Sequence, residues 1–334
     1  MRTEQEFASA PRAQDRPVIL VAAGSFGDGK RLIEHFTDVE LRFGDFSDPG
    51  RLAEVTEGVS GVVVTLQPLR APHIAALATS VRVIGRAGVG LDTIDLEAAK
   101  AAGITVVNQP SYGTREVASH AVALLLALQR RLCGLDDYVR RGWTGAPVLA
   151  PMKPVDELVV GLVGGGRIGR ATAEMLSSLV GEILVYDPAG PSLPGGAMAV
   201  PELDELLGRS DVVSLHLPLT PETTGMVDGA FLAKMTPGAL LVNVSRGQLV
   251  VEEALVAALE SGHIGGAALD VFAAEPLPST SPLLGAKNTL FTPHCASYSD
   301  RSGWRLASWA VGDTIAWLRT NTVEHGNIVV RGAR

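Results

Sequence analysis

The chain has 334 residues, more than one hydrophobic core usually supports, so two domains are expected. Its formal net charge of −8 disfavours nucleic acid or an anionic membrane surface as the main partner, so an anionic substrate would have to be bound by local cations. The two cysteines are too few for a disulfide framework and favour a reducing, cytoplasmic location.

The N-terminal segment, residues 1–16, is polar and lacks the apolar centre of a signal peptide, so we expect a mobile tail. The longest unbroken apolar run, 121–128, has eight residues, far short of the roughly 20 that cross a bilayer. We therefore expect a soluble protein without a membrane contact.

From Pro17 to about residue 110, short β-branched segments alternate with segments of helical spacing. Helices are predicted in "PHIAALAT" and in "DLEAAKAAG", which ends on Gly103 as a C-terminal cap. This alternation predicts a parallel sheet with helices on both faces. The strands are predicted at 18–23, 39–43, 61–66, 81–85 and 104–108.

A second series of the same kind begins near Leu158. Helical spacing lies between its strands, as in "RATAEMLSSL" and "VVEEALVAALESGHI". The two series predict two doubly wound α/β units. The units have a similar architecture but are not sequence repeats. The second set of strands is predicted at 158–164, 182–187, 211–217, 239–244, 266–272 and 288–293.

Two longer helices are predicted outside these series. The segment 114–132 has a broad apolar face, which fits a core helix as well as a domain connector or a dimer contact. The segment 301–320 has apolar residues at helical spacing and is expected to pack, with a return to the first unit as one option.

The stretch "LVVGLVGGGRIGRATAEML" carries Gly164, Gly166 and Gly169 directly after a predicted strand and at the start of a helix. The three glycines suit a tight turn, a close backbone approach to a pyrophosphate, and helix-to-strand packing. Backbone N–H groups near Arg167 and Ile168 would then face the pyrophosphate from a helix N-terminus. The glycine pattern alone is weak evidence for a dinucleotide site, and the flanking strand and helix support this interpretation.

Asp187 ends the next predicted strand, 23 positions after Gly164. A carboxylate at this place accepts hydrogen bonds from the ribose hydroxyls of a dinucleotide and repels a 2′-phosphate, which favours NAD over NADP. The alternative is a turn-forming aspartate before Pro188.

Three further polar residues follow predicted strands of the second unit, where doubly wound sheets bind ligands. The guanidinium of Arg246 could orient a substrate carboxylate with two hydrogen bonds. A histidine such as His294 suits proton donation to a carbonyl, and a carboxylate such as Glu275 could hold its tautomer. Singly, each has a plainer explanation as a surface cation, a packed histidine or a solvated loop acid, so the hypothesis depends on all three together.

The motifs "GGGRIG", "YDP", "HLPLTPET", "LVNVSRG", "ALDVFAAEP" and "TPH", in this order, resemble the D-isomer-specific 2-hydroxyacid dehydrogenases over about residues 60 to 300. The resemblance implies NAD-linked reduction of a small 2-keto acid to a 2-hydroxy acid, or the reverse, in a cleft between two domains of what is usually a homodimer. It also implies a flavodoxin-like substrate domain, residues 17–110 and 300–334, and a Rossmann NAD-binding domain, residues 111–299.

The resemblance assigns roles to individual residues. Arg246 would anchor the substrate, His294 would be the acid and base, and Glu275 would be its partner. In the first unit, Arg86 would be a second cation and the segment from Gly88 through Val89 to Gly90, facing Gln67, would bind the substrate carboxylate, although turn chemistry also explains these glycines. No metal site is expected. Further cofactor contacts are implied for Thr114, Pro218, Thr223, Val244 and Ser245, and for Asp270 near the nicotinamide carboxamide.

The segments "YGTREVASHA" and "TPHCASYSD" resemble the subgroup of C-terminal binding protein and some phosphoglycerate dehydrogenases. Two other functions therefore stay open: an NAD(H)-sensing, corepressor-like binding protein, and a phosphonate- or phosphite-type dehydrogenase. Thr93, Val251 and Ser297 depart from the usual family residues and leave the substrate side chain open. Cys295 is predicted to be a small apolar filler, because hydride transfer needs no thiol.

Overall fold

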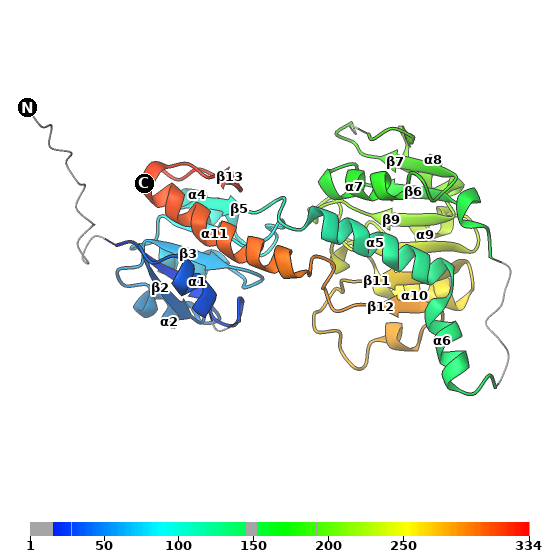
Figure 1. The fold of residues 1–334 in the computed structure, drawn as a ribbon, viewed down its shortest axis with the longest axis horizontal. Coiled ribbons are helices and arrows are strands. Elements are labelled where there is room, and N and C mark those ends of the chain that lie inside the picture. Colours follow the sequence, from blue (N-terminus) through cyan, green and yellow to red (C-terminus); the bar gives the residue numbers. More distant parts are fainter. Residues whose placement is uncertain (1–15, 28, 145–151, 191–192, 334) are drawn as a thin grey trace, which may run out of the picture. The chain divides into compact units, whose positions relative to one another are not determined.

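A computed structural model gives the fold and describes residues 16–27, 29–144, 152–190 and 193–333. The predicted tail, residues 1–16, lies outside these ranges except for Arg16. The chain forms two compact units: unit 1 is Met1–Tyr112 with Gly303–Arg334, and unit 2 is Gly113–Ser302 (Figure 1). Within the described ranges, every helix is too short or too polar to cross a membrane.

Unit 1 is built on a six-stranded sheet in the order β13-β5-β4-β3-β1-β2. Five strands run parallel in the flavodoxin-like order 2-1-3-4-5, as predicted. They are β1 (Val18–Ala22), β2 (Glu40–Gly44), β3 (Gly61–Val64), β4 (Val83–Arg86) and β5 (Thr105–Asn108).

The sixth strand of unit 1, β13 (Asn327–Val330), pairs antiparallel with β5. The five predicted strands are parallel, and no strand was predicted at this edge. β13 alternates between exposed and half-buried residues, so it lacks the continuous buried run that identifies the parallel strands.

Helices cover both faces of the unit 1 sheet, as predicted. The helix α11 (Asp300–Thr320) returns the chain to unit 1, where Ala307, Val311 and Ile315 are buried against Ile19 and Val63 (Figure 1). The helix α1 (Lys30–His35) packs on the same face through Leu32. The other face is covered by α2 (Pro49–Val55), α3 (Ala71–Leu77) and α4 (Leu96–Ala101).

Unit 2 is built on a seven-stranded parallel sheet in the order β12-β11-β10-β9-β6-β7-β8. Six of these strands follow the Rossmann order 3-2-1-4-5-6, and β12 adds one more at the edge. The short edge strand β8 is not among the predicted strands, because "AMA" carries no β-branched residue. The strands are β6 (Val159–Val163), β7 (Glu182–Tyr186), β8 (Ala197–Ala199), β9 (Val212–Leu215), β10 (Ala239–Asn243), β11 (Ile264–Leu269) and β12 (Thr289–Phe291).

Two hydrophobic clusters hold the unit 2 sheet between its helices. On one face, α5 (Thr114–Gln129) and α7 (Arg167–Leu176) bury Leu124, Leu128 and Leu176 (Figure 1). The other face is covered by α8 (Leu203–Arg209), α9 (Gly229–Lys234) and α10 (Glu252–Glu260). Short 3-10 turns lie at η2 (Val155–Glu157), η3 (Gly247–Leu249) and η4 (Pro282–Gly285).

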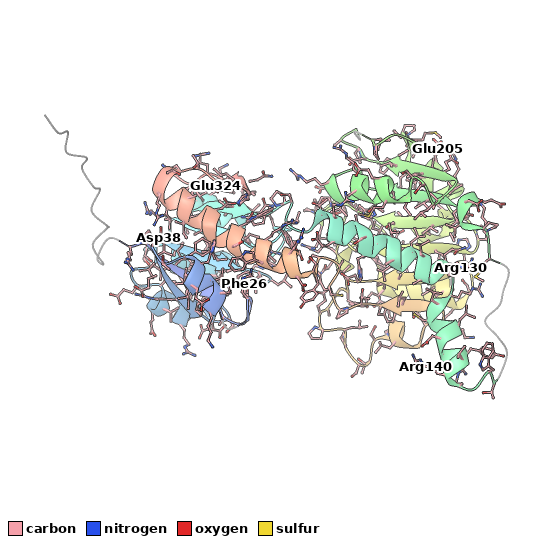
Figure 2. The ribbon with its side chains drawn as sticks, in the orientation of Figure 1. Phe26, Asp38, Arg130, Arg140, Glu205 and Glu324 are labelled. Carbon is pink, nitrogen blue, oxygen red and sulfur yellow. The ribbon has the colours of Figure 1, made fainter. Side chains whose placement is uncertain are left out.

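The predicted helix 114–132 is wrong at its end. The helix α5 stops at Gln129, whose side-chain amide donates to the Lys153 backbone oxygen at 2.7 Å. Arg131 takes a left-handed conformation with φ +54°, and a second helix, α6 (Leu132–Arg140), begins there. Figure 2 labels Arg140 near the end of α6, where its guanidinium pairs with Asp136 at 2.6 Å. The change of direction takes α6 off the core, and none of its residues is buried.

The predicted strand 266–272 is displaced: β11 ends at Leu269. The backbone N–H of Asp270 still donates to the Asn243 oxygen of the neighbouring strand at 2.9 Å. Residues from Asp270 to Glu275 therefore form a loop at the carboxyl edge of the sheet, and this loop carries much of the candidate site.

Candidate active site

The turn between β6 and α7 carries the glycine motif. Gly164 has φ +108°, and a Cβ there would lie 2.5 Å from the backbone oxygen of His216. A Cβ on Gly169 would overlap the backbone oxygen of Gly164, whereas a Cβ on Gly166 would meet no described atom within 4 Å. Two glycines therefore serve close packing, and the third leaves open space beside the backbone.

The open side of this turn fits a dinucleotide pyrophosphate. The helix α7 begins at Arg167 with Gly166 as its N-cap, and no side chain of the described residues caps it. The N–H groups of Arg167 and Ile168 belong to the first turn, whose amides have no partner inside the helix. Because a helix N-terminus favours an anion, the residues present suit the phosphates of NAD.

Asp187 lies beside this turn at the end of β7. Its Oδ2 accepts a hydrogen bond from the Gly165 N–H at 2.8 Å, and its Oδ1 accepts one from the Ala189 N–H at 2.9 Å. An ionised carboxylate can accept about four hydrogen bonds, so Asp187 can still accept hydrogen bonds from ribose hydroxyls. The turn-forming explanation of Asp187 and the cofactor explanation are therefore compatible.

The loop after β9 leaves the sheet next to the glycine turn, because β9 and β6 are neighbouring strands. In this loop the Thr223 hydroxyl donates to the Pro218 oxygen at 2.8 Å and accepts from the Thr220 N–H at 2.8 Å. These contacts fix the loop that carries the two predicted cofactor residues, Pro218 and Thr223.

His216 supports the glycine turn from behind. Its backbone oxygen limits the space at Gly164, and its Nε2 lies 2.9 Å from the Ser214 hydroxyl. Burial lowers the pKa of His216 from 6.5 to about 4, so the ring is neutral at physiological pH.

We expect the stability of unit 2 to fall as the pH drops from 6.5 towards 4. The unfolded chain takes up a proton in this range that the buried His216 ring resists, so acid favours unfolding by up to about 3 kcal/mol. Urea unfolding of the wild type and of His216→Asn at pH 7.5 and pH 5 measures this. The variant should lose part of the pH dependence, and an equal pH dependence in both proteins would contradict the assignment.

The segment after β10 is held by side chains of the same strand end. The Ser245 hydroxyl donates to the Leu215 oxygen at 2.8 Å, which ties the end of β10 to β9. Asn243 accepts from the Ser245 N–H at 3.0 Å and donates to the Arg246 oxygen at 2.8 Å. Arg246 is half-buried, and its Nη1 donates to the Ser245 oxygen at 2.8 Å. The segment with Val244, Ser245 and Arg246 is thus a fixed part of the sheet edge.

Gly247 joins this segment to the next loop. A Cβ on Gly247 would overlap the backbone of Phe272, so the two loops touch and only glycine fits. The Phe272 N–H in turn donates to Glu275 Oε1 at 3.0 Å. This chain of contacts links Arg246, the residue before Gly247, to the loop that carries Glu275.

Glu275 and His294 form a hydrogen bond. His294 Nδ1 lies 2.7 Å from Glu275 Oε2, and the carboxylate can only accept when it is ionised. The Nδ1 atom therefore carries the proton, which leaves Nε2 as the nitrogen available to a substrate. The resemblance implies this pair, and the geometry supplies it.

His294 has an unusual backbone conformation, with φ +51°. Such left-handed geometry is costly for a residue with a side chain and persists where neighbouring contacts hold it. The His294 N–H donates to the Asp270 backbone oxygen at 2.7 Å. The Asp270 carboxylate accepts from the Thr292 hydroxyl at 2.6 Å, from the Cys295 N–H at 3.0 Å and from the Ala296 N–H at 2.9 Å. The buried Asp270 thus holds the turn that presents His294.

His120, on α5, is a site residue that the sequence did not reveal. Its Nε2 lies 3.0 Å from the Thr292 hydroxyl and 3.6 Å from Asp270 Oδ1. Burial raises the pKa of Asp270, but the His120 ring, the Thr292 hydroxyl and the two backbone amides lower it by more, so the pKa lies below its ordinary value. The only sequence signal is a histidine at the start of the apolar run "AVALLLAL".

Cys295 is half-buried next to this carboxylate. Burial and the charge of Asp270 raise the pKa of the thiol, so Cys295 is protonated at neutral pH. A protonated thiol is a poor nucleophile, which agrees with the sequence-based view that Cys295 does no covalent chemistry.

The start of α5 lies beside the same turn. A Cβ on Gly113 would lie 3.2 Å from the Ser297 Cβ. The hydroxyl of Thr114, the first residue of α5, is buried and has no hydrogen-bond partner among the described residues. An unpartnered buried hydroxyl is costly, and a bound ligand would satisfy it.

The predicted substrate loop lies in unit 1, after β4. Arg86 is 3% exposed, and its Nη1 donates to the Ala87 oxygen. Its guanidinium occupies the space that a Cβ on Gly88 would need, and Gly88 has φ +143°. Val89 is exposed, and its oxygen accepts from the Asn108 amide at 2.8 Å. Arg86 therefore packs beneath the loop from Gly88 to Gly90 and supports it. Its role as a second cation for the substrate stays a prediction.

Gln67 also has its partners inside unit 1. Its Oε1 accepts from the Thr65 N–H at 2.8 Å, and its Nε2 donates to the Ser25 hydroxyl at 3.2 Å. The residue orders the loop after β3, and a contact with substrate remains a prediction.

Comparisons with known proteins identify the family of the chain. Residues 122–296 match the family model for the D-isomer specific 2-hydroxyacid dehydrogenase, NAD binding domain. The chain is 39% identical to a hydroxypyruvate reductase of Blautia hydrogenotrophica over 250 residues, 73% of this chain and 78% of that protein. A crystal structure of an NADPH-dependent glyoxylate/hydroxypyruvate reductase of Sinorhizobium meliloti, with NADP and malonate, superimposes with a TM-score of 0.85 at 32% identity, covering 96% of this chain and 99% of the other.

A D-3-phosphoglycerate dehydrogenase of Mycobacterium leprae is 35% identical over 312 residues, which is 88% of this chain and 56% of that protein. The chain thus spans only about half the length of this relative. Family model, sequence identity and fold all lead to the same conclusion: the chain belongs to the D-isomer specific 2-hydroxyacid dehydrogenase family.

Proposed function

We propose that the protein is an NAD-dependent dehydrogenase that reduces a small 2-keto acid to the D-2-hydroxy acid and catalyses the reverse reaction. The observation that carries this proposal is the 2.7 Å hydrogen bond between His294 Nδ1 and Glu275 Oε2 at the sheet edge that also holds the glycine turn. An NAD(H)-sensing protein would need the turn but would not need a tautomer-fixed histidine.

When bound, NADH would supply the hydride that reduces the 2-keto carbon. Nε2 of His294 gives its proton to the carbonyl oxygen, and the Glu275 carboxylate stabilises the protonated ring before the transfer. The guanidinium of Arg246 binds the substrate carboxylate and orients the carbonyl. In the reverse direction Nε2 takes the proton from the hydroxyl group.

The cofactor would be held by the first turn of α7 and by Asp187. Gly166 gives the pyrophosphate access to the backbone, and Asp187 receives the ribose hydroxyls. We propose that Thr114, Pro218, Thr223, Val244, Ser245 and Asp270 complete this site. Unit 2 would be the cofactor domain and unit 1 the substrate domain, and the junctions between the units lie two or three residues from the predicted domain bounds, 111–299 and 17–110 with 300–334.

We expect Asp187→Ser to weaken the preference for NADH over NADPH by roughly 10- to 100-fold, because a negative charge beside a 2′-phosphate costs a few kcal/mol. Ratios of kcat/KM for the two cofactors measure the change. Glu202→Ser, an exposed acid at the start of α8, serves as the control and should leave the ratio unchanged. An unchanged ratio in Asp187→Ser would remove Asp187 from the ribose site.

We propose a cytoplasmic homodimer in which α6 is part of the contact. Leu132 and Val139 on α6 are 53% and 47% exposed, and the nearby Trp143 is 69% exposed. Exposed apolar side chains grouped in this way are typical of protein contacts. The two free cysteines suit a reducing compartment. Sedimentation velocity tests the dimer, and a monomer at micromolar concentration would contradict it.

The substrate class is tested by following NADH absorbance with a panel of 2-keto acids. Hydroxypyruvate and glyoxylate come first because relatives are named for reducing them, followed by phenylpyruvate and phosphorylated 2-keto acids. Turnover of at least one acid is expected. NADH binding without turnover of any would support the sensor function, and turnover of phosphite alone would support the phosphite-type reaction.

A further inference from the structure

A cluster of three different side chains lies beside the His294 turn. His120 comes from α5, Asp270 follows β11 and Cys295 follows β12, and one ligand atom of each lies within 4.8 Å of the others. Because 120, 270 and 295 have no metal-ligand spacing in the sequence, only the fold brings them together. This group is called the HDC cluster below.

We propose that the HDC cluster binds a divalent cation of the zinc class. An imidazole nitrogen, a carboxylate oxygen and a thiolate sulfur are the three ligand types that zinc uses in proteins. Zinc bonds of about 2.0 to 2.3 Å in a tetrahedron separate the ligand atoms by roughly 3.3 to 3.8 Å.

The measured geometry is close to this requirement. His120 Nε2 and Asp270 Oδ1 are 3.6 Å apart, which already fits a shared cation. The widest separation in the HDC cluster is at most 4.8 Å, so a shift of about 1 Å would close it. His120 and Cys295 are both partly exposed, so a small movement of these side chains and entry of an ion from solvent are possible.

A cation would replace a hydrogen bond of the Asp270 carboxylate. Oδ1, the oxygen that faces His120, accepts from the Thr292 hydroxyl and from the Cys295 N–H, and Oδ2 accepts from the Ala296 N–H, so the cation would take the place of the Thr292 hydroxyl on Oδ1. The side chain is fully buried and charged, and a buried charge is strongly stabilised by an opposite charge at contact distance. A cation would supply that charge directly.

Binding would also change the other two ligands of the HDC cluster. His120 would exchange its 3.0 Å hydrogen bond with the Thr292 hydroxyl for a metal bond through Nε2, with the ring proton on Nδ1. Cys295 would lose its thiol proton to solvent, because the thiolate is the ligand form. The alternative is that the HDC cluster is only a hydrogen-bond network that shapes the His294 turn.

Cobalt(II) titration of the full chain, freed of metal by chelator, distinguishes the two. Cobalt(II) prefers the same ligands as zinc and gives a thiolate-to-metal charge-transfer absorption that zinc does not. We expect this absorption to saturate at one equivalent and to disappear when zinc is added. The measurement needs neither NADH nor a keto acid, so its outcome is independent of the proposed dehydrogenase activity.

Variants assign the signal to the HDC cluster. Cys295→Ala should abolish the absorption, whereas Cys133→Ala, which removes the exposed cysteine of α6, should leave it unchanged. His120→Gln should weaken cobalt binding by at least roughly 10- to 100-fold. Losing a residue that only hydrogen-bonds to a metal ligand already costs this much, and His120 would be a ligand itself. A circular dichroism spectrum and thermal melt equal to those of the wild type are required of each variant, with Cys295→Ser as the replacement if Cys295→Ala unfolds.

Two results would overturn the proposal. One is the lack of any thiolate-to-cobalt absorption in the folded wild type. The other is an absorption that survives Cys295→Ala and disappears in Cys133→Ala, which would place the ion at the α6 surface.

Discussion

His294→Ala lowers kcat roughly 100- to 10,000-fold with every 2-keto acid that the wild type reduces, while NADH binding is retained. This is the expected result because the variant loses the group that protonates the carbonyl oxygen, and general acids contribute factors of this size. His294 is held by the Glu275 carboxylate at 2.7 Å and by its own backbone contact with Asp270, so its ring has a fixed position at the sheet edge. Steady-state kinetics measure kcat, and a fluorescence titration measures the affinity for NADH.

Two further variants separate the chemistry from the fold. Glu275→Gln keeps an oxygen near Nδ1 but removes the charge that stabilises the protonated ring, so kcat should fall by about 100-fold with NADH affinity unchanged. His263→Ala removes a histidine at the opposite end of β11, where its Nε2 lies 3.0 Å from the Leu232 oxygen, and should leave kcat within about twofold. Full activity of a folded His294→Ala protein would remove the histidine from the mechanism.

Arg246→Ala is expected to lower kcat/KM for the 2-keto acid by roughly 30- to 5,000-fold, which corresponds to the about 2 to 5 kcal/mol that a charged hydrogen-bonded partner contributes. The loss should be dominated by KM, because the guanidinium binds the carboxylate in the ground state as well as in the transition state. The side chain is half-buried and anchored by its own bond to the Ser245 oxygen, so its position is fixed before substrate arrives.

Arg246→Lys gives the matched comparison. A lysine keeps the charge but cannot form two parallel hydrogen bonds with a carboxylate, so it should recover only part of the loss. Arg209→Ala, which removes an arginine paired with Glu205 on α8, should leave KM unchanged. A KM unchanged in Arg246→Ala would show that the substrate carboxylate is bound elsewhere.

Much of the fold follows from local sequence. Buried β-branched runs such as "GVVV" in β3 and "VVSL" in β9 identify parallel strands, because these strands are covered on both faces. The segments that escaped prediction lack this signal: β13 is a half-exposed edge strand, and β8 is three residues of alanine and methionine. The end of α5 was also not predicted, because Arg131, which takes the left-handed conformation, follows helix-favouring residues and no glycine or proline marks the break.

The candidate site also has parts that the sequence predicts and parts that it does not. The glycine motif and Asp187 flank one strand–helix–strand unit, so the spacing together with the predicted strands and helix indicates a joint site, and the Gly165 N–H donates to the Asp187 carboxylate. The contact of Gly247 with Phe272 and the place of His120 beside Asp270 join residues 25 or more positions apart. Such contacts depend on which strands become neighbours, and no local pattern reveals them.

The most direct measurement of the central claim uses NADH that carries deuterium at both C4 positions, incubated with the protein and the best 2-keto acid of the panel. Mass spectrometry and chiral chromatography of the product should find one deuterium at C2 of the D-2-hydroxy acid, and about 1% or less of this product when His294→Ala replaces the wild type over the same time. Tight binding of the labelled NADH with no deuterium in any product, or deuterium in the L-enantiomer, would contradict the proposed function.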